Sequence, residues 1–347
     1  MPTIAIDCRF AHLPVGIGRY TRELVTELLK REDNIQYVLI VLPEGEAWAD
    51  ALPHSPRIVV AHASHYSLRE HFELRRILKD VHPDLFFSPH FTVPYFCPVP
   101  SVVTIHDLIL HRFPNRAHPL RRLAYRALFS RSVRRARRVI AVSAFTAMEL
   151  QKVYDGPVAE KLTVIPEGIS PEFVHRSSEE QEGALRAYGI SKPFFLYVGN
   201  AKQHKNVKLL IDAFTRIDRN DAQLILVMGG KEAASVRLRD GVRYLPHVKD
   251  EHLPALYSAA TAFVTASLYE GFGLTIAEAA ACGCPIIATR CGAIPEVAPP
   301  DAVLLPPEIG AFAEAMKKPP VTSSPRQLFW KDAAEKTVEV LKDAAVK

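Results

Sequence analysis

The chain has 347 residues, of which 48% are hydrophobic and 23% charged, and its formal net charge is +5. This length is enough for about two domains that each bury a core, and the composition excludes a disordered chain. The sequence has no apolar run of about 18 residues, the length of a membrane-spanning helix, and residues 1–8 do not resemble a secretory signal. We therefore expect a globular cytoplasmic protein.

The five cysteines do not follow a disulfide or zinc pattern. Their number is odd, and the closely spaced Cys282, Cys284 and Cys291 have neither a second cysteine pair nor a histidine nearby. We expect them to be small core residues.

Strands and helices alternate along the first half of the chain. The hydrophobic pattern predicts strands at 3–10, 36–42, 57–61, 84–88, 101–105 and 138–142, and helices at 19–31, 68–79, 120–137 and 144–153. This alternation favours a parallel sheet with helices on both faces. Ligands of such sheets bind at the carboxyl ends of the strands, so polar residues that follow strands are candidates for a site.

Three segments of the first half follow predicted strands. Gly16 and Gly18 precede the first helix, in a turn that lacks the third glycine and the acid of a nicotinamide-binding fold. They are either a loop that approaches a ligand or a plain helix start. His90, His106 and Asp107 follow the fourth and fifth strands. Their side chains can bind sugar hydroxyls, or they can be structural residues of loops and core.

The segment Arg116–Arg138 carries nine arginines and no acids, with apolar residues at helical spacing between them. This pattern predicts an amphipathic basic helix. Its basic face is either an ordinary solvated surface or a site of attraction to an anionic membrane or a phosphorylated lipid. Nucleic acid is disfavoured as a partner, because few aromatic residues interleave the arginines.

The second half repeats the alternation. Predicted strands lie at 194–198, 223–228, 242–244, 261–265, 285–288 and 302–305, and predicted helices at 207–217, 251–260, 275–282, 309–317 and 327–345. The polar, acidic segment 177–183 is expected to lie near a linker between domains.

Residues 267–285 form a predicted strand end, a glycine loop and a helix. Gly271 and Gly273 allow close backbone approach to a ligand, and the first turn of the helix favours phosphate. Glu270 and Glu278 are then hydrogen-bond acceptors for sugar hydroxyls, or else a solvated loop acid and a surface helix residue. Lys205 follows the first strand of this half and can neutralise a phosphate, or it is a surface residue.

The stretch from Glu270 to Glu278, Glu-Gly-Phe-Gly-Leu-Thr-Ile-Ala-Glu, resembles the E-x7-E signature of retaining glycosyltransferases of family 4, and Val15–Tyr20 resembles the glycine entry of family 4 transferases. The chain also resembles mannosyltransferase-like members of this family. The resemblance implies a GT-B fold, with two Rossmann-like, doubly wound α/β domains facing each other across a cleft. It places an acceptor-side domain at 1–170 with a crossover helix at 327–347, and a nucleotide-sugar domain at 171–326.

The same resemblance implies roles for individual residues. Catalytic roles fall to His106, Lys205 and Glu270, and acceptor-side roles to His90 and Asp107. Donor-binding roles fall to Gly16, Gly18, Asn200, Gly271, Phe272, Gly273, Leu274, Thr275 and Glu278, with Gly292 and Glu296 supporting the donor site.

Three positions depart from the family pattern. Asn200 and His204 stand where many members have arginine, so His204 or Lys202 is a candidate to replace that cation. Glu167 stands where asparagine is usual, which leaves a direct role for this position open.

The reaction that this resemblance implies is a retaining, metal-independent transfer of a hexose from a nucleotide diphosphate sugar to a hydroxyl of a glycan or lipid-linked acceptor. GDP-mannose is the favoured donor, and no cofactor is expected. The sequence contains no Asp-x-Asp metal signature, which agrees with a metal-independent reaction. Two alternatives stay open, a GT-B-like epimerase or phosphorylase and a non-catalytic nucleotide-sugar-binding protein. Peripheral contact with the inner face of the membrane through Arg116–Arg138 is a further hypothesis. Donor base, acceptor, linkage and oligomeric state do not follow from the sequence.

Overall fold

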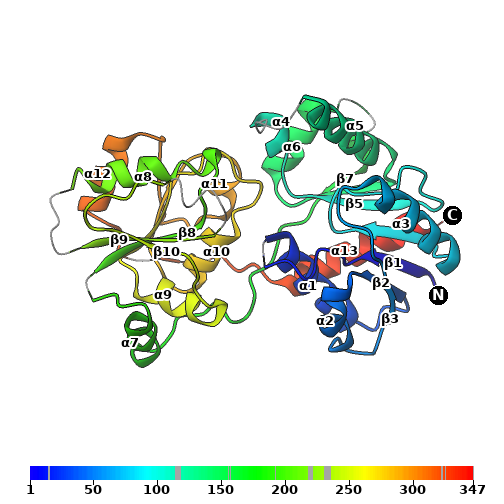
Figure 1. Ribbon diagram of the computed structural model, residues 1–347, viewed down its shortest axis with the longest axis horizontal. Helices are drawn as coiled ribbons and strands as arrows, with labels where there is room; N and C mark the ends of the chain where they lie inside the picture. The colour runs from blue at the N-terminus through cyan, green and yellow to red at the C-terminus, as the bar shows by residue number, and fades with distance from the viewer. Residues whose placement is uncertain are drawn as a thin grey trace. The chain divides into compact units, whose positions relative to one another are not determined.

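The computed structural model describes residues 1–14, 16–113, 119–154, 156, 158–191, 193–217, 222–229, 236–321, 323–324 and 326–346, with only the backbone for 119–121. The chain divides into two compact units. Unit 1 comprises Met1–Gly168 and Leu328–Lys347, and unit 2 comprises Ile169–Gln327. The last helix, red in Figure 1, therefore belongs to the same unit as the blue N-terminal elements.

Unit 1 is built on a seven-stranded sheet in the order β3-β2-β1-β4-β5-β6-β7. Every pair of neighbouring strands runs parallel. The strands are β1 (Thr3–Asp7), β2 (Gln36–Val41), β3 (Arg57–Val60), β4 (Leu85–Ser88), β5 (Ser101–Ile105), β6 (Arg138–Ala141) and β7 (Leu162–Val164). The helices are α1 (Gly16–Leu29), α2 (Glu46–Asp50), α3 (Leu68–Val81), α4 (Ile109–Arg112), α5 (Pro119–Arg135), α6 (Ala144–Val153) and α13 (Trp330–Ala345).

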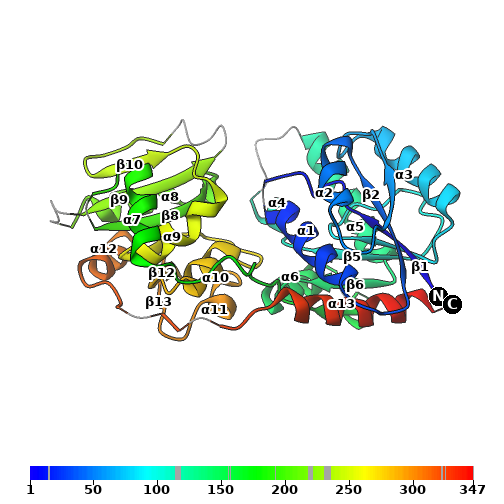
Figure 2. The same ribbon diagram turned by 90° about the horizontal axis from the view of Figure 1, so that it is seen from below.

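Helices cover both faces of this sheet, because its central strands are apolar on both sides. One face packs Phe86, Val103 and Val139 against α3, α5 and α6 in a single core cluster. The other face is covered by α1 and α13, which lie side by side in both ribbon views (Figures 1 and 2).

The start of α13 is fitted closely against the end of the first stretch of unit 1. A Cβ atom on Gly168 would lie 2.2 Å from the amide nitrogen of Trp330 and 2.6 Å from its Cα. The Trp330 ring stacks edge-on against Tyr20 of α1, with 5.6 Å between ring centroids. A glycine at position 168 is therefore required for the helix to dock at this distance.

Unit 2 repeats the same architecture on a six-stranded parallel sheet in the order β10-β9-β8-β11-β12-β13. Its strands are β8 (Phe194–Asn200), β9 (Gln223–Gly229), β10 (Val242–Leu245), β11 (Ala262–Thr265), β12 (Ile286–Thr289) and β13 (Val303–Leu305). Its helices are α7 (Ser178–Ala187), α8 (Val207–Phe214), α9 (Leu253–Ala259), α10 (Leu274–Ala281), α11 (Ile294–Val297) and α12 (Ile309–Lys317).

Alternate residues of β8 point to opposite faces of this second sheet, as the pleat requires. Phe194 and Leu196 pack with α9 and α10, whereas Phe195 and Tyr197 pack with α8 and α12. Both sheets follow the Rossmann strand order, in which the first three strands are added towards one edge and the next strand starts again on the other side of the first. The predicted fold class, two doubly wound parallel α/β units, is confirmed.

The polar segment 177–183, expected near a linker between domains, is helical in the structure. Ser177 is the N-cap of α7, which follows the boundary between the two units at Gly168 and Ile169. Ser177 caps this helix by accepting from the amide of Glu180, while the Glu180 carboxylate accepts from the amide of Ser177. This reciprocal pair is a capping box, and the Ser-x-x-Glu spacing that signals it is present in the sequence.

The basic segment also differs from the prediction. Arg116 lies outside the described residues, and α5 begins at Pro119. The apolar positions of α5 do not form one buried stripe: Phe129 and Val133 are buried, but Leu123 is 66% exposed. Within the part of the chain that the structure describes, no helix is both long and apolar enough to cross a membrane.

We predict that Gly168→Ala destabilises unit 1 by about 1–3 kcal/mol, because the added methyl group must displace the start of α13. Trp48 and Trp330 are the two tryptophans of the chain and both belong to unit 1, so tryptophan fluorescence during urea unfolding reports on this unit. The matched control is Gly45→Ala, whose Cβ would meet Val41 Cβ at 3.7 Å, an ordinary contact distance. Its expected effect is within about 0.5 kcal/mol. Equal midpoints for the two variants would contradict the prediction.

Candidate functional site

In unit 2, Lys205 and Glu270 meet at the carboxyl edge of the sheet. Lys205 ends a short 3-10 turn after β8, and Glu270 lies in the loop after the neighbouring strand β11. The Nζ atom of Lys205 lies 2.6 Å from Oε1 of Glu270, and the two side chains are 18% and 14% exposed. The structure thus brings together two residues that are 65 positions apart, and leaves both within reach of solvent.

The glycine loop after Glu270 leads directly into α10. Gly273 adopts a left-handed backbone with φ of 102° and is the N-cap of the helix. Such a backbone is open to glycine and unfavourable for most other residues. Gly292 supports the loop from the following βα connection: a Cβ there would lie 2.6 Å from the Glu270 carbonyl oxygen, and the amide of Ala293 donates to that oxygen.

The first turn of α10 carries Leu274 and Thr275, which are partly exposed, after the buried Gly271 and Phe272. An N-terminal turn presents backbone amides at the positive end of the helix dipole and favours an anion. Glu278, one turn further on, is only 2% exposed. It is therefore not the surface helix residue that the sequence left open.

Asn200, the last residue of β8, and His204, in the turn that follows, do not restore a cation. Asn200 accepts hydrogen bonds at its side chain from the Lys202 amide and at its carbonyl from the Tyr197 hydroxyl. Burial, together with the charge of Lys205, lowers the pKa of His204 to about 4. His204 is thus neutral at physiological pH, and the exposed Lys202 is left as the candidate to replace the missing arginine.

In unit 1, His106 lies at the end of β5 with both ring nitrogens bonded. Nε2 donates to the carbonyl oxygen of Pro89 at 2.8 Å, and Nδ1 donates to Oε1 of Glu167 at 3.1 Å. Burial lowers the pKa of His106, but the hydrogen bond and charge of Glu167 outweigh this, and the net pKa is raised. Two acceptors on one ring require two ring protons, so the geometry favours an imidazolium.

Tyr20 of α1 completes the surroundings of His106. Its ring stands edge-on to the imidazole, with 4.6 Å between centroids and an interplanar angle of 87°. Its hydroxyl lies 3.2 Å from Oγ1 of Thr104. The contacts of Tyr20 with His106 and Thr104, together with the hydrogen bond from His106 to Glu167, connect α1, the end of β5 and the loop that carries Glu167.

A cavity of about 270 Å³ opens beside these strand ends in unit 1, and His90, His106 and Asp107 all line it. His90 lies near Thr92, with Nδ1 3.0 Å from the threonine hydroxyl, and burial lowers its pKa well below the usual value. The Asp107 carboxylate accepts from the amide of Ile109. The three residues predicted from strand ends therefore share one cavity.

The two glycines of the first loop have different surroundings. Gly18 lies inside α1, where a Cβ would come within 2.0 Å of the Leu13 carbonyl oxygen. That close approach gives Gly18 a structural reason of its own. A Cβ on Gly16, at the start of α1, would meet no heavy atom within 4 Å.

Sequence reasoning missed Tyr20 and did not assign Glu167 a role. Glu167 lies 61 residues from its partner His106, so no local spacing signals the pair. The departure from asparagine at this position was the one available hint. Among the described residues, no group of three or more His, Cys, Asp or Glu is arranged to hold a metal ion.

Comparisons with known proteins follow the division of the chain. The family described as Glycosyltransferase Family 4 matches residues 14–173, and the family described as Glycosyl transferases group 1 matches residues 184–319. The chain belongs to glycosyltransferase family 4. The first match lies within unit 1 apart from its last few residues, and the second lies within unit 2.

This glycosyltransferase is 29% identical over 313 residues to O-antigen chain mannosyltransferase B of Escherichia coli, covering 81% of this chain and 80% of that protein. It is 27% identical over 244 residues to the O-antigen chain mannosyltransferase RfbU of Salmonella typhimurium, covering 68% and 64%. The crystal structure of Anabaena HepE with UDP and glucose superposes with a TM-score of 0.76 at 18% identity, over 99% of each chain. WaaG, a glycosyltransferase of lipopolysaccharide biosynthesis, gives 0.64 at 17% identity, over 99% of this chain and 90% of that one. These structures confirm the GT-B fold.

We predict that the pKa of His106 lies above 6.5 in the glycosyltransferase and falls in Glu167→Gln, because the amide keeps the shape of the side chain but removes its charge. A folded-state pKa above the unfolded value gives stability that is complete below pH 6.5 and is lost as pH rises through the folded-state pKa. Nuclear magnetic resonance titration of the His106 ring protons measures the midpoint directly.

Glu160→Gln removes a charge from an exposed position of the same unit and serves as the control. It should leave the His106 midpoint unchanged. An equal midpoint in wild type and Glu167→Gln would show that the carboxylate does not hold the imidazolium.

Proposed function

We propose that this glycosyltransferase moves a hexose, with mannose favoured, from a nucleotide diphosphate sugar to an acceptor hydroxyl with retention at the anomeric carbon. The bond between the anomeric carbon and the diphosphate oxygen breaks, and a bond to the acceptor oxygen forms. The acceptor proton passes to the departing phosphate. The observation that carries the proposal is the Lys205–Glu270 ion pair beside the first turn of α10.

Lys205 stabilises the negative charge that develops on the leaving phosphate. Its ammonium lies 2.6 Å from Oε1 of Glu270, so a diphosphate would compete with this carboxylate for an ammonium that is already positioned. The amides at the start of α10 supply further positive potential. This set of groups needs no metal ion to neutralise the leaving group, and we assign the reaction as metal-independent.

Glu270 and Glu278 accept hydrogen bonds from the donor. The Glu270 carboxylate, freed from Lys205 by the diphosphate, takes hydroxyls of the transferred sugar. Glu278, buried in α10, takes hydroxyls of the ribose. A carboxylate beside a diphosphate is favourable only when it faces such donors.

His106 acts as a cation rather than as a base in this proposal. Both of its ring nitrogens already donate, to Pro89 and Glu167, so neither can accept the acceptor proton. Attack on the same face as the departing phosphate fits this arrangement, because the phosphate itself takes the proton and no covalent nucleophile is required.

The preference for mannose rests on the relatives whose names are O-antigen chain mannosyltransferases. A GDP-mannose donor and a glycan or lipid-linked acceptor are the substrates that we propose on this basis. UDP is the competing nucleotide, because the HepE structure was obtained with UDP. In this proposal unit 2 binds the donor and unit 1 binds the acceptor.

We predict that one of GDP, UDP and ADP, and its sugar, raises the thermal unfolding midpoint without added metal. Ligand at 100 times its Kd stabilises the native state by about 2.7 kcal/mol. Glu278→Ala and Lys205→Met should lose most of this shift. Lys208→Met is the matched control, because Lys208 also follows β8 in the chain but its side chain is 86% exposed. This variant should keep the full shift in the unfolding midpoint.

Turnover with the stabilising nucleotide sugar then tests the chemistry. Lys205→Met should lower kcat by about 10²–10³ relative to Lys208→Met, the effect of removing one group that stabilises a developing oxyanion. EDTA should not change the rate, and the product should keep the anomeric configuration of the donor. Donor turnover without acceptor would favour the epimerase or phosphorylase alternative, and binding without any turnover would favour a sensor.

A contact with anionic membranes is the second function that we propose, for the surface around α5. Leu123 projects from this basic helix at 66% exposure, and Tyr95 and Phe96 are 50% and 62% exposed. The guanidinium of Arg131 lies 3.9 Å from the centroid of the Tyr95 ring. Exposed aromatic and apolar side chains among arginines suit the interface of an anionic bilayer.

We predict that the protein floats with vesicles that contain anionic lipid, because the arginines attract the anionic surface. With neutral vesicles the protein should remain at the bottom of the gradient. Leu123→Ser combined with Phe96→Ser should reduce flotation several-fold, because less apolar surface enters the interface. Leu238→Ser, which changes an exposed leucine of unit 2, should not. Flotation independent of lipid charge, or unchanged in the double variant, would rule out this surface.

A further inference from the structure

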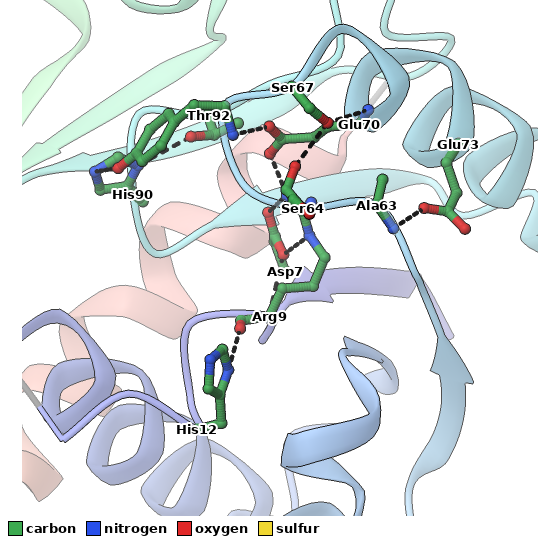
Figure 3. A network of polar contacts seen from close by, with 11 residues as sticks. Asp7, Arg9, His12, Ala63, Ser64, Ser67, Glu70, Glu73, His90 and Thr92 are labelled. Carbon is green, nitrogen blue, oxygen red and sulfur yellow. Dashed lines mark hydrogen bonds and ion pairs between the residues drawn. The ribbon is translucent and has the colours of Figure 1, made fainter.

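Unit 1 fixes the connection after its first strand with buried ion pairs. Arg9, two residues beyond β1, donates through Nε and Nη2 to both carboxylate oxygens of Asp7, at 2.8 and 2.7 Å, and through Nη2 to Glu70 of α3 at 2.7 Å. Figure 3 shows these three side chains meeting, and each is at most 1% exposed. Glu70 also accepts from the amide of Tyr66, whose φ is 60°. The network therefore holds a backbone conformation that residues other than glycine rarely adopt.

Unit 2 fixes the equivalent connection, after its first strand β8, with a neutral hydroxyl. Tyr197 is 1% exposed and packs among apolar residues of α8 and α12. Its hydroxyl donates to the carbonyl oxygen of Asn200 at 2.7 Å, three residues further along the strand. Burial, together with the charge of Glu270, raises the pKa of Tyr197, so the hydroxyl keeps its proton and remains a donor.

The phenol of Tyr197 lies along the strand because the next residue on the same face is a glycine. Residues two apart in a strand point to the same face, so Gly199 follows Tyr197 on the side of α8 and α12. A Cβ at Gly199 would lie 2.7 Å from the Tyr197 hydroxyl oxygen and 3.1 Å from Cζ. A larger residue at position 199 would therefore move the hydroxyl away from the Asn200 carbonyl.

Asn200 connects this hydrogen bond to the turn that carries Lys205. Its side-chain oxygen accepts from the amide of Lys202 at 3.1 Å, and the carbonyl oxygen of Lys202 accepts from the amide of Lys205 at 2.9 Å. The amide of Leu268, in the loop after β11, donates to the carbonyl oxygen of His204 at 2.7 Å. The turn is thereby fixed on two sides, against the end of β8 and against the loop after β11.

Lys205, at the end of this turn, carries the ammonium that the proposed transfer uses. Its Nζ lies 2.6 Å from Oε1 of Glu270. A lysine side chain is flexible and ends in a compact charge, so its backbone must be held in place if the charge is to stay at one point. A shift of the Asn200 carbonyl would move the ammonium relative to the leaving phosphate, and a misplacement of about 1 Å can cost about 10²-fold in rate.

We propose that Tyr197 is a positioning residue for Lys205. Its hydroxyl fixes the Asn200 carbonyl and, through it, the turn that directs the ammonium at the phosphate. The inference rests on the proposed transfer function, because that reaction requires the ammonium at one place. Tyr197 is buried and contacts no substrate, so removal of its hydroxyl should lower the rate without removing any group that binds the donor.

Tyr197→Phe tests this role, because it keeps the ring in the core and removes only the hydroxyl. With the nucleotide sugar that stabilises the wild-type protein, kcat should fall about tenfold. In the Lys205→Met background the same substitution should leave kcat unchanged, since no ammonium remains to be positioned. Tyr188→Phe is the matched control, because this hydroxyl at the end of α7 also has a backbone partner, the amide of Lys249 at 3.1 Å. Its removal should not change kcat.

Equal kcat in the wild type and Tyr197→Phe would overturn the proposal. A decrease of the same size with and without Lys205 would also overturn it, because the hydroxyl would then act on the fold rather than through the ammonium. Gly199→Ala moves the same hydroxyl without removing it, and kcat should fall as it does in Tyr197→Phe. Unchanged kcat in Gly199→Ala would contradict the proposal independently of how Tyr197→Phe folds.

Acylation of lysine amines without any nucleotide gives a readout that does not depend on the proposed function. Lys205 is 18% exposed, whereas Lys208 in the following helix is 86% exposed. The ratio of label at Lys205 to label at Lys208, measured by mass spectrometry, should rise several-fold in Tyr197→Phe. Tyr188→Phe should give the wild-type ratio.

A ratio that does not change in Tyr197→Phe would show that the hydroxyl does not hold the ammonium. If no nucleotide stabilises the protein and no transfer occurs, the proposed function fails, while the labelling ratio still decides whether Tyr197 positions Lys205.

Discussion

Parallel pairing of neighbouring strands is the constraint on which the candidate sites of both units depend. In a parallel sheet all carboxyl ends lie at one edge, so every loop from a strand to its following helix arrives there. The loops after β8 and β11 bring Lys205 against Glu270 in this way, and the end of β5 brings His106 to the cavity of unit 1. Residues far apart in sequence become neighbours because the sheet orders their strands, and the apolar character of those strands secures the sheet.

Three ion pairs at these edges differ in how far they are buried, and this difference suits them to different tasks. Arg9 and Glu70 have no exposed side-chain surface, so their pair is fixed and holds backbone geometry. In the second pair His106 is 18% exposed but Glu167 only 5%, and this carboxylate keeps the imidazole charged. Lys205 and Glu270 remain partly exposed, so a charged ligand can exchange with either partner. Desolvation makes a buried unpaired charge costly, which is why the first pair is the least replaceable.

Local patterns account for most of what the sequence predicted correctly. Strand β5 and helices α6 and α12 have the predicted bounds. Apolar runs and helical periodicity are visible within a short stretch of sequence, so these bounds could be predicted without the tertiary structure. The polar, acidic composition of residues 177–183 indicated a nearby linker, whereas the Ser177–Glu180 capping box at the start of α7 was not recognised in the sequence. His204 was considered as a cation, but its burial beside Lys205 makes it neutral, and burial is not visible in local composition. The left-handed backbone of Tyr66 likewise has no signature in a tyrosine.

The sequence by itself determined the two doubly wound units, the glycine loop before α10 and the family, because each is encoded in contiguous residues or in short, fixed spacings. It also identified His90, His106 and Asp107 as residues at strand ends. Only the tertiary structure decided what those residues contact: Glu167 on His106, Glu270 on Lys205, and Glu70 on the amide of Tyr66. Contact and burial depend on how distant strands and helices pack in three dimensions, and the protonation of a side chain follows from both.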